Sequence, residues 1–116
     1  MFVARVASTY VEFTRALDSR QLPRAVAAAR DLPQLSLDDA LALCLLYAEQ
    51  APGRYAAAAA RWHGRLALEA GLDLLESQLA LGALMLLPGP SGERGTKILA
   101  EIGRRHRVPL ARSLGG

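Results

Sequence analysis

Residues 36–51 read SLDDALALCLLYAEQA, and this stretch decides the fold class of the chain. The Ser36 hydroxyl can accept a hydrogen bond from the backbone N–H of Asp39, as in a helix N-cap. Asp38 and Asp39 lie where the positive end of a helix dipole favours negative charge. From Leu37 to Gln50 the apolar side chains leave no polar face in the middle of the helix, which is typical of a buried helix. The stretch therefore predicts a capped, buried helix.

The helix-forming composition of this stretch extends over the whole chain. Alanine and leucine occupy 44 of the 116 positions, and aromatic residues make up only 5%. Alanine and leucine rank highest in helix propensity, whereas β-sandwiches and barrels favour β-branched and aromatic residues. Disorder requires low hydrophobicity, and 52% of this chain is hydrophobic. We therefore predict an all-α protein.

Proline and glycine divide the chain into about six predicted helices. They are expected at Val3–Ser19, Leu22–Leu32, Leu37–Gln50, Arg54–Ala70, Asp73–Leu87 and Glu93–His106. A cap signal at Asp73 and Glu76 repeats the one at Ser36 and Asp39 after 37 residues. Repeats of about this length build stacked helix pairs, although capped leucine helices can also align in this way by chance. We expect three stacked αα-hairpins, as a short solenoid or an orthogonal bundle.

The predicted domain is a single helical one over residues 1–108, followed by a flexible C-terminal tail over residues 109–116. The two helices that are apolar all round, at 37–50 and 73–87, should lie at its centre. The residues expected to be largely buried are Leu41, Cys44, Leu45, Trp62, Leu75 and Leu79.

Residues that could carry chemistry are sparse, and we expect neither an enzyme nor a bound cofactor. No serine lies in a nucleophile-elbow pattern, and the glycine motifs that hold nucleotides are missing from the sequence. Cys44 and two distant histidines, His63 and His106, are too few to predict a metal site. His63 is expected to be partly buried with a backbone partner. One cysteine, no recognisable signal peptide and no apolar run of about 20 residues indicate a cytoplasmic protein that does not enter a membrane.

Charge is distributed unevenly, and this gives the main functional hypothesis. The net charge is +3, and the two most apolar predicted helices carry only acids. Three arginines of the helix at 54–70 fall within about 40° of one another around its axis. With cations of the last predicted helix, they give a candidate surface for an acidic protein partner: Arg54, Arg61, Arg65, Lys97, Arg104 and Arg105. We therefore predict a non-enzymatic interaction or regulatory module, with a merely solvated basic face as the alternative.

Nucleic-acid binding is the second functional hypothesis. The arginines near the C-terminus could contact phosphates, and they are Arg104, Arg105, Arg107 and Arg112. No aromatic residue that could stack on bases lies among them. The sequence leaves the partner's identity open, and it also leaves a homo-oligomer open.

Overall fold

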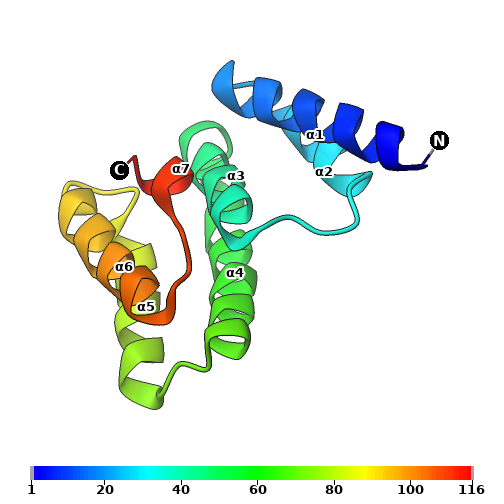
Figure 1. The fold of residues 1–116 in the computed structure, drawn as a ribbon. Helices are drawn as coiled ribbons and strands as arrows, with labels where there is room; N and C mark the ends of the chain where they lie inside the picture. The colour runs from blue at the N-terminus through cyan, green and yellow to red at the C-terminus, as the bar shows by residue number, and fades with distance from the viewer. Residues whose placement is uncertain (1, 116) are drawn as a thin grey trace.

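The computed structural model describes residues 2–115, and within this range the chain folds into seven α-helices without a strand (Figure 1). The all-α prediction is therefore confirmed. The elements are α1 (Phe2–Asp18), α2 (Leu22–Arg30), α3 (Leu37–Gln50), the 3-10 turn η1 (Pro52–Arg54), α4 (Tyr55–Ala70), α5 (Leu74–Leu86), α6 (Gly92–His106) and α7 (Ala111–Leu114).

Consecutive helices pack as three hairpins, α1 with α2, α3 with α4, and α5 with α6. Helix α3 lies between the first hairpin and the rest of the molecule. Its Leu46 packs into the core of the first hairpin around Phe13, while Leu41 and Cys44 belong to the larger core around Trp62. Because α3 contributes to both cores, it is the central helix, as its sequence predicts.

Both predicted helix caps form. The Ser36 Oγ atom accepts a hydrogen bond from the Asp39 N–H at 3.0 Å. At the start of α5, the Asp73 carboxylate accepts from the Glu76 N–H at 2.8 Å, and Glu76 accepts in return from the Asp73 N–H. These reciprocal bonds satisfy backbone donors that a helix leaves free at its start. They explain why α3 and α5 begin where the sequence predicts.

The prediction that α5 is a central, fully buried helix is wrong. The side chains of Leu75 and Leu79 are exposed, at 65% and 46% of their full area. Helix α5 packs chiefly against α4 and α6, and it buries a narrow face that includes Ala80, Ala83 and Leu84. Two neighbouring helices cover only part of the circumference of α5, so its apolar sequence alone does not bury it. Leu41, Cys44 and Trp62 are buried as predicted, and Leu45 is half-buried.

Residues 109–115 lie against the helices, where the sequence predicted a flexible tail over residues 109–116; residue 116 lies outside the described range. Leu110 is buried, and α7 packs against α3. The Asp38 carboxylate accepts two hydrogen bonds from the start of α7, from the N–H groups of Arg112 at 3.0 Å and Ser113 at 2.8 Å. The Asp38 carboxylate thus holds the C-terminal segment against the start of α3.

Candidate functional site

A groove of about 770 Å³ lies between α6 and the C-terminal segment. Three cationic side chains line it, those of Lys97, Arg104 and Arg107. The remaining lining is apolar or small: Thr96, Ala100, Gly103, Val108, Pro109, Leu110, Ala111, Leu114 and Gly115. Among the described residues, no aspartate or glutamate is part of the lining. The groove therefore combines apolar surface with positively charged side chains.

The groove exists because the chain reverses sharply at the end of α6. Arg107 adopts the left-handed conformation, with φ at 58°, and the Val108 N–H then donates to the Gly103 carbonyl at 2.8 Å. A Cβ atom on Gly103 would lie 2.8 Å from the Val108 carbonyl oxygen, and 3.2 Å from Leu110. Glycine is thus required at position 103 for the segment to lie this close to α6.

The three cations of the groove remain available to a ligand. The Lys97 Nζ atom lies 3.6 Å from Glu93, and the Arg104 guanidinium pairs with Glu101, but all four side chains are largely exposed. Ion pairs of this kind contribute only about 0–1 kcal/mol to stability, so an incoming carboxylate can compete with them. Arg107 makes no ion pair with any residue in the described range 2–115.

Arg105 and Arg112 point to other partners. Glu76 is buried at the start of α5, and its carboxylate lies 2.8 Å from His106 Nε2 and 3.7 Å from the Arg105 guanidinium. The hydrogen bond from His106 lowers the pKa of Glu76 below its ordinary value. Arg112 lies 3.2 Å from the buried carboxylate of Asp39. Of the four arginines proposed to contact phosphates, only Arg104 and Arg107 line the groove.

The α4 arginines line a separate hollow. Arg61 and Arg65 border a space of about 240 Å³ between α3 and α4, and the Arg65 Nε atom is 2.5 Å from Glu69. Arg54 is exposed in η1. This hollow and the α6 groove share no lining residue. One basic face that joins Arg54, Arg61 and Arg65 to the cations of α6 therefore stays a prediction. Lys97 and Arg104 do line the same groove.

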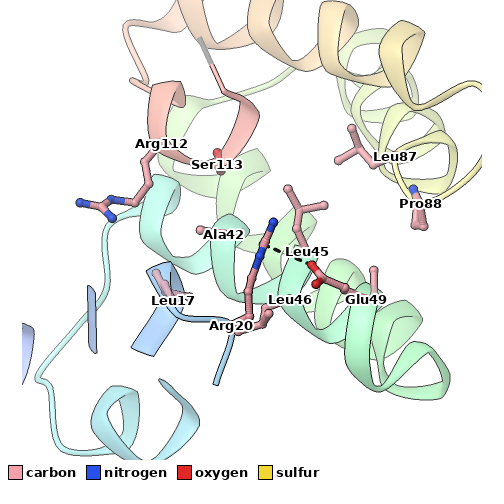
Figure 2. A pocket seen from close by; sticks show the side chains of 11 residues that line it. Leu17, Arg20, Ala42, Leu45, Leu46, Glu49, Leu87, Pro88, Arg112 and Ser113 are labelled. Atoms are coloured by element: carbon pink, nitrogen blue, oxygen red, sulfur yellow. Dashed lines mark ion pairs between the residues drawn. The ribbon is translucent and has the colours of Figure 1, made fainter. Parts of the chain in front are cut away.

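A third cavity, of about 450 Å³, joins the end of α1 to α3, α7 and the residues that follow α5. Figure 2 shows an ion pair among its lining residues, between Arg20 Nη1 and Glu49 Oε2 at 3.2 Å. The Arg112 side chain turns away from this pair (Figure 2), consistent with its contact with Asp39. Arg20, Glu49 and Arg112 in this cavity all have ion-pair partners, whereas Arg107 in the α6 groove has none within residues 2–115, so the groove is the better candidate site.

The contact between His63 and Ser77 does not have the arrangement of a catalytic pair. His63 is half-buried, and its Nε2 atom lies 2.8 Å from the Ser77 carbonyl oxygen and 3.0 Å from Ser77 Oγ. A carbonyl oxygen can only accept, so Nε2 carries the proton and cannot remove one from the hydroxyl. The backbone partner predicted for His63 is confirmed, and this contact ties α4 to α5.

The described residues offer little other chemistry. Cys44 is buried, and burial raises the pKa of its thiol to about 11, which disfavours the reactive thiolate. Among residues 2–115, no three histidine, cysteine, aspartate or glutamate side chains gather where a metal ion could bind. None of the described helices has the length and apolar character needed to cross a bilayer.

Comparison with known proteins finds no matching family model, no similar curated protein and no matching solved structure. A functional interpretation of this chain therefore rests on its own geometry.

Proposed function

We propose that this protein is a non-enzymatic interaction module, and that it docks an acidic, partly apolar segment of a partner protein in the groove between α6 and the C-terminal segment. One observation carries the proposal: the groove is lined by three cations and several apolar residues, with no acid among them. Such a lining complements carboxylates and leucine-like side chains on one peptide. A single buried thiol suits the reducing cytoplasm, where we expect the module to act.

The backbone of Arg107 supports this assignment. The left-handed conformation costs a residue with a Cβ atom about 1–2 kcal/mol, and glycine is the usual residue where a helix ends in this way. Here the position holds an arginine, and its side chain lines the groove. Strained backbone tends to occur at functional sites. Arg20, which follows α1, has the same conformation with φ at 57°, and of the two arginines only Arg107 lines the groove.

A protein segment fits the groove better than a nucleic acid does. Nucleic-acid sites rely on phosphate contacts and on aromatic side chains that stack on bases. Within residues 2–115 no aromatic residue lines the groove, and two of the four C-terminal arginines are paired with Glu76 and Asp39. Apolar residues such as Val108, Pro109 and Leu114 have no counterpart in a phosphate backbone.

Selection from a random-peptide display library tests the proposal without assuming a partner. Peptides enriched on the wild-type protein should combine aspartate or glutamate with leucine or phenylalanine. The variant Lys97→Glu/Arg104→Glu should lose them, because it reverses two of the three charges that the peptide meets. The matched control Arg54→Glu/Arg61→Glu changes net charge equally at surfaces outside the groove, so it should retain them.

Two results would contradict the proposal. One is a set of enriched peptides without acids, or peptides that bind the groove variant as well as the wild type. The other is strong binding of random duplex DNA or RNA with a steep loss of affinity as salt rises, which would favour the nucleic-acid hypothesis.

A further inference from the structure

Helix α5 presents an apolar face that no residue in the described range 2–115 covers. Leu74 and Met85, near its two ends, are exposed at 77% and 76% of their full area, and Leu75 at 65%. Leu79 and Leu81, nearer the middle, are exposed at 46% and 41%. Together these five side chains present on the order of 600 Å² of apolar surface, about as much as the largest apolar patch on a typical monomer.

The exposed residues follow the spacing of a helix that pairs with another helix. Leu74, Gln78, Leu81 and Met85 are separated by four, three and four residues. This spacing places them within about 60° of one another around the axis of α5. Side chains at such positions interlock with an opposing helix in the manner of knobs and holes.

The face also lacks charge. Residues 77–92 contain no aspartate, glutamate, lysine or arginine, and the nearby Glu76 is buried against His106. A helix that lies on a membrane surface usually carries lysine or arginine on its polar side, and α5 carries neither. A surface without charge can meet an identical surface without like-charge repulsion, which suits a two-fold pairing.

We infer that two copies of this chain associate through α5, with the two α5 helices antiparallel across a two-fold axis. Of this surface, the stripe of Leu74, Leu81 and Met85 contributes about 400 Å² in each copy, whereas Leu75 and Leu79 lie about 100–140° further around the helix. The pair therefore buries about 800 Å² in total, the size of a weak, transient interface. We expect a weak association, with a dissociation constant on the order of 100 µM. A two-fold axis across the middle of α5 brings Leu74 of one copy opposite Met85 of the other. This association uses a surface separate from the α6 groove, and it goes beyond the proposed function.

Sedimentation equilibrium over roughly 1–500 µM protein tests the inference directly, because that range spans the expected dissociation constant. The wild type should approach twice its chain mass of 12.4 kDa as concentration rises. Leu74→Glu and Met85→Lys should each remain monomeric. The new acid would lie in the first turn of α5 and the new cation in the last turn, so the helix dipole favours both and the fold should survive. Circular dichroism verifies that helical content is retained.

An equimolar mixture of the two variants tests the antiparallel geometry. In the mixed dimer the new glutamate lies opposite the new lysine, so the mean mass should rise above that of either variant alone. The matched control is Val3→Glu, which places an acid at an equally exposed apolar residue in the first turn of α1, and it should dimerise like the wild type.

Several results would overturn the inference. A wild type that stays monomeric over the whole range rules the association out. A Leu74→Glu variant that dimerises normally places the interface elsewhere, and a mixture no heavier than its components contradicts the antiparallel pairing. A monomer that floats with neutral phosphatidylcholine vesicles would assign the α5 face to a membrane surface instead.

Discussion

Replacing Arg107 by glycine and, separately, by alanine should separate the strain at this position from its role in binding. Arg107 is the left-handed residue that ends α6, and its side chain lines the groove. Both replacements remove the guanidinium, but only glycine relieves the backbone. The two variants should therefore differ in stability and agree in their weakened affinity for an acidic peptide.

The expected magnitudes follow from the geometry. A residue with a Cβ atom loses about 1–2 kcal/mol in the left-handed conformation, so alanine retains this cost and glycine does not. Glycine also makes the unfolded chain more flexible, and this lowers the free energy of unfolding by about 0.4–1 kcal/mol. The glycine variant should thus be more stable than the alanine variant by about 0.5–1 kcal/mol. For a domain of this size the difference in Tm should be about 2–4 °C.

Thermal unfolding followed by circular dichroism measures the stability difference, and fluorescence anisotropy with a peptide selected on the wild type measures affinity. Each variant should bind about five-fold more weakly than the wild type, because an exposed charge contact is worth about 1 kcal/mol. Equal stability of the two variants would contradict the left-handed backbone conformation of residue 107. Wild-type affinity in both would show that the guanidinium does not contact the ligand.

Three further predictions test the core and the paired charges. Cys44 should resist thiol reagents in the folded protein at pH 8 and react once urea unfolds it, because burial raises its pKa to about 11. Fast labelling of the native protein would show that the α3–α4 core is open. The free energy of unfolding should fall as acid protonates Glu76, because the pKa of this carboxyl is lower in the folded protein than in the unfolded chain. The stability that this gives is fully present above the ordinary glutamate pKa of about 4.3, and it is lost as the pH falls through the lower pKa of the folded protein. Glu76→Gln should flatten this fall in a urea-denaturation series, and an unchanged profile would count against the contact with His106. Leu66→Ala should cost about 2–5 kcal/mol because Leu66 is fully buried, whereas the exposed Leu75→Ala should cost less than about 0.5 kcal/mol. Equal costs in calorimetry would contradict the placement of α5.

Local signals in the sequence predicted the helices well, because each helix is set by neighbours in the chain. The cap at Ser36 and the glycine after Ala70 act within a few residues, and α3 and α4 end as predicted. The exposure of Leu75 could not be predicted in the same way. Both faces of α5 are apolar in sequence, and only its position beside α4 and α6 decides which face is covered.

The candidate groove was only partly visible in the sequence. Helical phase relates Lys97 to Arg104, seven residues apart, and the structure places both at one site. Arg105 is one residue further, about 100° around the helix, and it reaches Glu76 instead. The contacts of α7 with Asp38 span 74 and 75 residues, and no local pattern marks them. Because the sequence does not reveal that the C-terminal segment lies against α3, it could predict the cations but not the apolar surface beside them.

An NMR titration of the isotope-labelled protein with a peptide selected on the wild type tests the central claim most directly. The backbone resonances of Lys97, Arg104, Arg107 and Leu110 should shift with increasing peptide, while those of α1 and α2 should stay in place. Lys97→Glu/Arg104→Glu should abolish the shifts. Shifts concentrated at Arg61 and Arg65, or on α5, with the α6 groove unchanged, would contradict the assignment of the groove as the docking site.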